Sequence, residues 1–349
     1  MDPSDLSQQI KHWGRQLGFQ SVGISDTELS QAEQYLQAWL DQGYHGSMDW
    51  MAKHGLRRSR PAELQPGTLR VISARMNYWP GNALEAQSVL DDPDLAYISR
   101  YALGRDYHKL MRRRLQQLAD KIHGDIGDYG YRVFVDSAPV LEKPLAQKAG
   151  LGWIGKHTNL ITREAGSWFF LGEIYTDLPL VADAAHADDH CGTCRACIDS
   201  CPTGAIIAPY QLDARLCISY LTIELHGSIP EPLRPLMGNR IYGCDDCQLV
   251  CPWNRFARDS AEQDFFPRHE LDQSTLVALF GWDKATFESR LAGSPIRRIG
   301  YERWLRNLAV ALGNAGTDKS ITSALEKRRD HPSALVREHV AWALARHGE

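Results

Sequence analysis

The sequence predicts a multidomain protein that combines α+β and α/β architecture: an N-terminal α/β domain, a ferredoxin-like middle domain and a C-terminal helical domain with a HEAT-like repeat. Three observations support this division. Helix and strand patterns alternate up to about residue 180, all eight cysteines lie between residues 191 and 251, and helical patterns alone follow residue 274. The chain of 349 residues with a hydrophobic fraction of 43% suits several globular domains. We expect these domains to span residues 1–182, 183–262 and 263–349.

The N-terminal domain is predicted from elements that alternate along the chain. Apolar residues from Leu6 to Leu17 recur at helical spacing, and Gly18 is a favourable helix stop. Alternation of helices and strands is typical of a sheet with helices packed on its faces. The expected helices cover about 6–17, 28–40 and 142–149, and the expected strands cover 19–24, 69–76, 131–136 and 167–175.

Asp136 stands at the end of the strand expected over 131–136. Open α/β sheets place ligands and catalytic groups at such an edge, which makes Asp136 a candidate catalytic residue. The alternative is that this side chain only caps a helix. The glycine-rich stretch GLGWIGK at residues 150–156 would let the backbone approach a cofactor, although it is neither G-x-G-x-x-G nor a phosphate-binding loop.

The clearest motif is CGTCRACIDSCP at residues 191–202. Its C-x2-C-x2-C-x3-C-P spacing is that by which bacterial ferredoxins bind iron–sulfur clusters, and a stretched copy follows it. In two-cluster ferredoxins the fourth cysteine of each run ligates the other cluster. The spacing therefore predicts two [4Fe–4S] clusters. One is held by Cys191, Cys194, Cys197 and Cys251, and the other by Cys217, Cys244, Cys247 and Cys201.

Structural zinc sites are the alternative for these cysteines, because C-x2-C is also zinc spacing. Cluster ligands must stay reduced, which points to a reducing compartment. The polar start of the chain does not look like a secretory signal, and no apolar run approaches the roughly 18 residues of a membrane span. We therefore expect a cytoplasmic protein without membrane contact, and a monomer because no heptad pattern is present.

Two basic stretches are candidate contacts for a polyanion. The stretch RYALGRDYHKLMRRRL at residues 100–115 begins a long helix, in which Arg105, Lys109 and Arg112 would contact phosphates. The interleaved Tyr107 and His108 would be able to stack on bases. Around residues 297–306, arginines including Arg297, Arg298 and Arg306 give a second helix a basic side. A solvated helix face is the alternative, since the net charge of the chain is only −4.

The C-terminal domain is predicted to be a short helical repeat. Residues 304–313 and 336–345 resemble each other in the placing of small and apolar residues. Such a pair is typical of HEAT-like units, whose stacked helices build extended binding surfaces.

The order of these motifs resembles one family, epoxyqueuosine reductase, which completes queuosine synthesis in transfer RNA. The resemblance rests on RYALGRDYHK, VDSAPVLEKPLAQKAGLGWIGKHTN, CGTCRACIDSCPTGAI, CISYLTIELHG, NRIYGCDDCQLVCPWN and RWLRNLAVALGN, and it covers about residues 20–345. It implies a cobalamin bound to the N-terminal domain, two [4Fe–4S] clusters and a tRNA that carries epoxyqueuosine. It also implies a small electron-donor protein of the flavodoxin or ferredoxin class.

The resemblance assigns roles to individual residues. Asp136 matches the proton donor of the family. No D-x-H-x-x-G segment is present, so no histidine is expected below the cobalt. The residues that match segments near the cobalamin are Arg58, Ser137, Gly152, Trp153, Gly155, Lys156, His157 and Ser219.

Two other functions compete with this interpretation. A corrinoid reductive dehalogenase would usually carry a twin-arginine export signal and would lack a basic helical tail. Neither of these two expectations fits the sequence. An electron carrier fused to an RNA-binding module would have the clusters but no cobalamin. A corrin absorption band after reconstitution separates the carrier from the enzyme.

Overall fold

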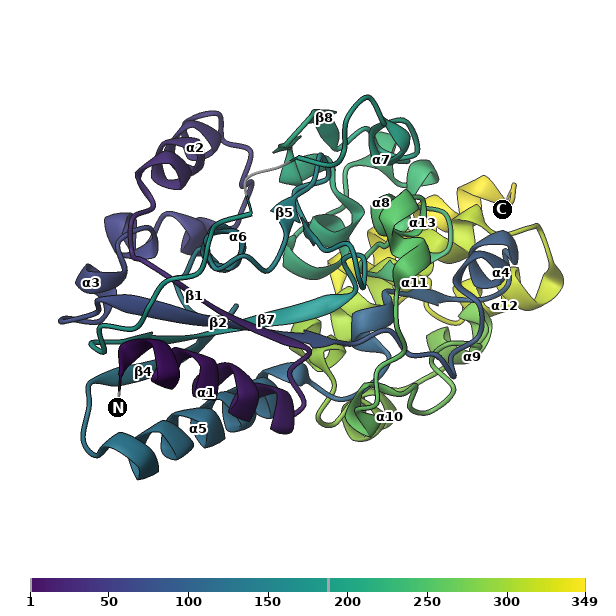
Figure 1. Ribbon diagram of the computed structural model, residues 1–349. Helices are drawn as coiled ribbons and strands as arrows, with labels where there is room; N and C mark the ends of the chain where they lie inside the picture. The colour runs from purple at the N-terminus through teal and green to yellow at the C-terminus, as the bar shows by residue number, and fades with distance from the viewer. Residues whose placement is uncertain (1, 187–188, 349) are drawn as a thin grey trace.

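The computed structural model describes residues 2–186 and 189–348 (Figure 1). At its centre is a sheet with strand order β1-β2-β7-β4, and every neighbouring pair runs antiparallel. The alternation of helices and strands had suggested the strand-end rule of open α/β sheets. The chain instead reverses direction between these neighbours, so that rule does not apply here. The strands are β1 (Ser21–Ser25), β2 (Arg70–Asn77), β4 (Tyr131–Val135) and β7 (Phe169–Thr176).

One face of the sheet is an apolar core against two helices. Ile24, Ile72 and Ile174 pair across the strands and are fully buried. They pack against α1 (Pro3–Gln16) and α5 (Tyr107–Ile126), which lie side by side beneath the sheet in Figure 1. Burial of such side chains is worth about 1.5–3 kcal/mol each, so this layer fixes the position of α5 relative to β4.

The opposite face is covered by α6 (Glu142–Lys148) and is less apolar. Leu145 packs on it together with Val71 and Tyr175. At Gly23 a Cβ atom would lie 2.1 Å from the carbonyl oxygen of Ala149, so glycine is required for the close approach of α6. The sequence-based boundaries of the four strands and of α1, α2 (Ser30–Asp41) and α6 agree with the structure to within three residues, whereas α5 begins seven residues later than expected.

The cysteine-rich segment folds into short elements. Helices α7 (Ala196–Asp199) and α8 (Asp246–Leu249) contact each other, and β8 (Ile206–Ala208) pairs with β9 (Gln211–Leu212). Strand β10 (Arg240–Tyr242) pairs in parallel with β3 (Tyr97–Ile98). The buried Asp245 accepts hydrogen bonds from Tyr97 and Ser99, which ties the segment to the N-terminal part. The remaining short elements are α2 (Ser30–Asp41), α3 (Pro61–Leu64), α4 (Ala86–Asp91), β5 (Trp153–Ile154) and β6 (Leu160–Ile161).

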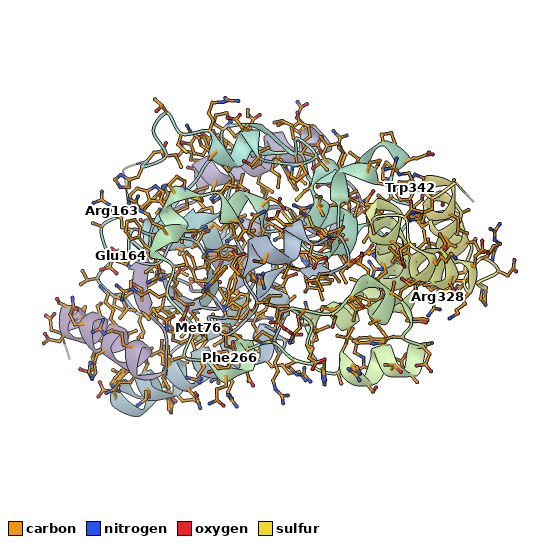
Figure 2. The ribbon with its side chains drawn as sticks, turned by 90° about the vertical axis from the view of Figure 1, so that its right-hand side faces the viewer. Met76, Arg163, Glu164, Phe266, Arg328 and Trp342 are labelled. Atoms are coloured by element: carbon orange, nitrogen blue, oxygen red, sulfur yellow. The ribbon has the colours of Figure 1, made fainter. Side chains whose placement is uncertain are left out.

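The C-terminal part is helical. The two similar sequence segments lie in α11 and α13, which pack against each other with Trp304 fully buried. Arg328, labelled in Figure 2, donates to the carbonyls of Phe280 and Trp282 and so joins the end of α12 to α9. The helices are α9 (Leu276–Phe280), α10 (Lys284–Arg290), α11 (Gly300–Asn314), α12 (Lys319–Glu326) and α13 (Ala334–Arg346).

One expectation for this part was wrong. Arg306 was expected on a basic outer face, but its side chain is fully buried. Its guanidinium donates to the carbonyls of Leu221, Leu225 and Gly227, so it satisfies the irregular backbone that precedes β10. Within the described residues, no helix is long and apolar enough to cross a membrane.

Candidate functional site

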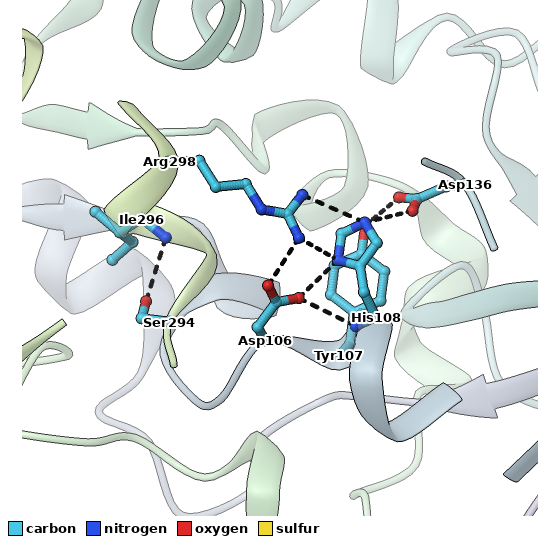
Figure 3. A network of polar contacts seen from close by, with 7 residues as sticks. All are labelled: Asp106, Tyr107, His108, Asp136, Ser294, Ile296 and Arg298. Atoms are coloured by element: carbon cyan, nitrogen blue, oxygen red, sulfur yellow. Dashed lines mark hydrogen bonds and ion pairs between the residues drawn. The ribbon is translucent and has the colours of Figure 1, made fainter. Parts of the chain in front are cut away.

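Asp136 follows the last residue of β4 and is held by the first turn of α5 (Figure 3). The ring Nε2 of His108 lies 2.6 Å from Asp136 Oδ1. The hydroxyl of Tyr107 donates to the other carboxylate oxygen, Oδ2. The N-cap of α6 is Leu141, which has no side-chain cap. The carboxyl group of Asp136 is therefore directed to Tyr107 and His108, and the helix-cap alternative does not describe its contacts.

The other side of the His108 ring faces a second carboxylate. Its Nδ1 lies 2.6 Å from Asp106 Oδ1, and Asp106 is also the N-cap of α5. Arg298, from the 3-10 turn η10 (Pro295–Ile299), places a guanidinium nitrogen 2.7 Å from Asp106 Oδ2. Figure 3 shows that Arg298 contacts both Asp106 and the His108 ring, with guanidinium nitrogens 2.7 Å from Nδ1 and 3.3 Å from Nε2, and that His108 in turn contacts Asp136.

The protonation of His108 follows from these neighbours. Burial alone would lower the pKa of His108, but the carboxylates of Asp106 and Asp136 outweigh burial and raise the pKa to about 9. The two carboxylates therefore favour the imidazolium, whereas the Arg298 guanidinium, which can only donate, lies 2.7 Å from Nδ1 and favours the neutral ring. Tyr107 stacks between His108 and Phe170, with ring centroids 4.2 and 3.7 Å away. Burial raises the pKa of Tyr107 far above its usual range, and Asp136 adds to this effect.

The carboxyl groups of Glu142 and Glu173 interact electrostatically with Asp136. Burial raises the pKa of Glu142 to about 8, and the charge of Asp136 contributes. Burial also raises the pKa of Glu173 well above its usual range, with contributions from Glu142 and Asp136. Glu173 pairs with Ser73 across the sheet, and both side chains are fully buried. Among the described residues, the two carboxyl oxygens of Glu173 and the hydroxyl of Ser73 have no hydrogen-bond partner.

The first predicted cysteine set surrounds one cavity. This cavity has a volume of about 210 Å³, and Lys156, His157 and Trp253 also line it. The Lys156 ammonium donates to the carbonyl of Cys194 at 2.8 Å. The cysteines that line the cavity are Cys191, Cys194, Cys197 and Cys251. The fold thus brings a cysteine of the second run to the first three, as the crossed arrangement requires.

The cysteines of the second predicted set influence one another electrostatically. Burial raises the pKa of Cys217, and the charge of Cys201 adds to the increase. Burial raises the pKa of Cys244, and after Asp246 the charges of Cys217 and Cys247 contribute. The thiols of Cys201, Cys217, Cys244 and Cys247 are therefore within electrostatic reach of one another.

The residues expected near a cofactor occupy several environments. Arg58 is buried and donates to the carbonyls of Trp50 and Met51. Burial, assisted by the charge of Lys143, lowers the pKa of His157 to about 4, so its ring is neutral. The His157 Nε2 and the Trp153 Nε1 are buried without a hydrogen-bond partner among the described residues.

The other members of the expected set lie at turns. Ser137 is exposed, and Ser219 precedes the π-helix at Tyr220–Glu224. A Cβ atom at Gly152 would lie 2.1 Å from the carbonyl oxygen of Ile161, and one at Gly155 would meet the Ile161 side chain at 2.4 Å. These two glycines therefore serve the tight packing of β5 on β6.

The basic residues divide into two groups. Lys109, Arg112 and Arg297 have exposed side chains, and Arg105 is exposed beside Asp264, with a 3.2 Å contact between their charged groups. Arg298 instead belongs to the Asp106 network. That contact brings η10 to the start of α5, so the two predicted basic stretches meet at one place.

The roles of Tyr107 and His108 were not predicted from the sequence. Both were expected to stack on bases, yet both are buried against Asp136. The expectation was wrong because α5 was thought to begin at residue 100, whereas it begins at Tyr107 with Asp106 as its cap. A signal was present: Tyr107 precedes Met111 and Leu115 at a spacing of four, which marks the inner face of a helix.

Comparison with protein families gives two matches. Residues 58–137 match the family described as "Epoxyqueuosine reductase QueG, DUF1730". Residues 190–254 match the "4Fe-4S double cluster binding domain". The first match ends just beyond Asp136, and the second contains all eight cysteines.

Curated relatives align over the whole chain. An epoxyqueuosine reductase from Pseudomonas aeruginosa is 64% identical over 348 residues, which cover 100% of this chain and 96% of the relative. One from Escherichia coli is 60% identical over 346 residues, covering 99% and 90%. Among solved structures, an epoxyqueuosine reductase with an epoxyqueuosine-modified tRNA-Tyr stem loop superposes with a TM-score of 0.89 at 27% identity, covering 99% and 91%. A Bacillus subtilis epoxyqueuosine reductase with its catalytic loop swung out of the active site gives 0.88 at 26% identity, with the same coverage.

Proposed function

The chain belongs to the epoxyqueuosine reductase family, and we propose that it reduces epoxyqueuosine in tRNA to queuosine by the groups described above. The observation that carries the proposal is identity of 64% along the whole chain to a protein of that name. The related structure with a modified tRNA stem loop supports tRNA as the substrate. The competing assignments leave this similarity unexplained.

The reaction sets what the site must supply. Removing the epoxide oxygen breaks two C–O bonds and forms one C=C bond. The oxygen leaves as water, so each turnover consumes two electrons and two protons. The site therefore needs an electron path and a proton donor close to the departing oxygen.

The electron path is assigned to the two cysteine sets, and the match to a double-cluster domain supports two [4Fe–4S] clusters. The set of Cys191, Cys194, Cys197 and Cys251 holds one cluster, and the set of Cys201, Cys217, Cys244 and Cys247 holds the other. A small flavodoxin or ferredoxin-like protein supplies the electrons. Cys194 is exposed, which favours entry of electrons at the first cluster.

A cobalamin is proposed as the group that receives these electrons, and its chemistry when bound is reduction of the epoxide carbon. The residues fit such a group, because a corrin edge rich in amides needs buried partners. Ser73, Glu173 and His157 offer buried polar atoms that have no partner among the described residues. These three side chains would bind cobalamin, and Glu142 adds a fourth polar group nearby.

Asp136 is assigned as the proton donor to the departing oxygen. It is partly open, with 35% of its side chain exposed, so a substrate atom can approach it. Tyr107 and His108 hold its carboxyl group from behind and fix its direction. A positioned acid of this kind contributes about 10²–10⁴-fold to a rate.

The tRNA is assigned to the surface where the start of α5 meets η10. Lys109, Arg112 and Arg297 are exposed there and suit phosphate contacts. We further propose that residues 263–349 act as a HEAT-like unit on residues 1–182 and 183–262. A cytoplasmic monomer is the state in which we expect the enzyme to work.

One assay tests the proposed function. Protein with reconstituted clusters is incubated with cobalamin, a reductant and epoxyqueuosine-containing tRNA, and the nucleosides are analysed by mass spectrometry. Queuosine should form, and its formation should require cobalamin. A corrin absorption band on the purified complex separates the enzyme from an electron carrier. Absence of queuosine with both clusters and cobalamin bound would contradict the proposal.

A further inference from the structure

The proposed reaction consumes two protons per turnover, whereas the carboxyl group of Asp136 carries one at most. The Asp136 carboxyl group must therefore be reprotonated within each turnover, and a side chain in contact with it is one source of the second proton. Only groups in direct contact with this carboxyl can supply that proton without an intervening water. Among the described residues, the Asp136 carboxyl group contacts Tyr107 and His108. The inference that follows rests on the proposed function.

The two neighbours differ sharply as acids. The Tyr107 phenol is buried between two rings, and burial keeps its proton bound far above neutral pH. The carboxylates of Asp106 and Asp136 raise the pKa of His108 to about 9, and its Nε2 lies 2.6 Å from Asp136 Oδ1. An imidazolium is a much stronger acid than a buried phenol, so His108 is the better proton source.

We propose that His108 is the proton store of the active site and delivers protons to Asp136 for transfer to the departing oxygen. In each transfer the Nε2–H bond of His108 breaks while an O–H bond forms on Asp136 Oδ1. The proton on Asp136 then passes to the substrate oxygen, and His108 becomes a neutral imidazole. Water reprotonates His108 between the two transfers, and the two electrons come from the clusters.

Asp106 and Arg298 are positioning residues in this scheme. Asp106 is 2.6 Å from Nδ1, which fixes the ring so that Nε2 points to Asp136. Arg298 holds the second oxygen of Asp106, and 51% of its side chain is exposed, so the network reaches solvent on that side. The titratable or charged groups that act on His108 are Asp106, Asp136 and Arg298, and its charge also acts on Glu142.

The decisive variant is His108→Gln, because glutamine can still donate a hydrogen bond to Asp136 but cannot release a proton. His123→Gln is the matched control, since His123 lies in the same helix with 53% of its side chain exposed. We expect kcat of His108→Gln to fall by about 10²-fold, with KM for tRNA changed less than about twofold. Wild-type kcat should fall as pH rises through about 9, where His108 loses its proton, and the variant should lose this limb.

A second measurement does not depend on turnover or cobalamin. NMR of ¹⁵N-histidine in the oxidised, cobalamin-free protein should show the His108 ring protonated at pH 7.5. Asp106→Asn should move its titration to lower pH, because one stabilising carboxylate is lost.

Several results would overturn the assignment. A neutral His108 ring at pH 7.5 would do so, as would unchanged kcat and an unchanged pH profile in His108→Gln. If wild-type protein forms no queuosine, the proposed function fails instead, and the NMR titration still reports on His108.

Discussion

Asp136 and Glu173 are carboxyl groups that interact electrostatically, yet they differ in exposure and in the contacts of their oxygens. Asp136 is partly exposed, its Oδ2 accepts a hydrogen bond from Tyr107, and its Oδ1 lies 2.6 Å from His108 Nε2 in an ion-pair contact. Glu173 is fully buried in the middle of β7, and neither of its oxygens has a partner among the described residues. A buried polar group without a partner costs about 1–3 kcal/mol.

This contrast indicates two kinds of site. The Asp136 carboxyl group is held by Tyr107 and His108 of the chain itself, so its position is fixed before any ligand arrives. The buried carboxyl group of Glu173 lacks hydrogen-bond partners among the described residues, which is the pattern expected where a ligand supplies them. The proton donor Asp136 and the buried side chains proposed to bind cobalamin are therefore neighbouring but distinct groups.

The largest expected effect tests the role of Asp136 as the proton donor. Asp136→Asn keeps the size of the side chain and removes the acidic proton, so turnover should drop by about 10²–10⁴-fold. Binding of tRNA and cobalamin should stay normal, because Asp136 is not among the side chains proposed to bind either of them. Single-turnover formation of queuosine, with cofactor content verified, measures the effect. Near-normal turnover would remove Asp136 from the chemistry.

The position of Asp136 was predictable because an apolar strand pattern ends beside it. Its partners were not identified, because the face on which Tyr107 and His108 lie depends on where α5 begins. Glu173 was hidden for a different reason. In SWFFLGEIY it reads as one polar residue in a buried strand, and only the register with Ser73 reveals an unsatisfied pair. The crossed cysteine sets were predicted from the spacing that two-cluster ferredoxins use, and the structure places Cys251 beside the first three cysteines of the other run.

The second prediction tests whether Glu173 binds cobalamin. Glu173→Leu removes a proposed cobalamin partner and should weaken cobalamin binding by about 10-fold or more, the equivalent of one lost hydrogen bond to a buried group. Titration of the corrin absorption band measures this affinity. Asp136→Asn is the matched control and should bind cobalamin like wild type. Equal affinity in both variants would show that the two regions are not divided as proposed.

The third prediction concerns the surface of α5 outside both regions. Lys109 and Arg112 lie three residues apart and are exposed on the same side of the helix. Reversing both charges to glutamate should weaken tRNA binding several-fold and reduce its salt dependence, because fewer counterions are released. Cobalamin affinity should not change. Lys121→Glu, about three turns further along α5, is the control; a loss as large as that of the double variant would mean that the effect is not local.

The smallest effect is on stability and depends on pH. The folded protein keeps a proton on Glu173 at pH values where the unfolded chain, with an ordinary glutamate pKa of about 4.3, has lost it. Stability from this group is therefore complete at low pH and declines as pH rises above about 4.3 toward the raised pKa of the folded state. Glu173→Gln cannot titrate, so its Tm relative to wild type should increase between pH 5 and pH 8 in the cobalamin-free protein. Thermal melts of both proteins, with Asp136→Asn as a second control, measure the difference. A constant Tm difference across this range would mean that Glu173 is ionised in the folded protein, and the contrast with Asp136 would then lie only in exposure.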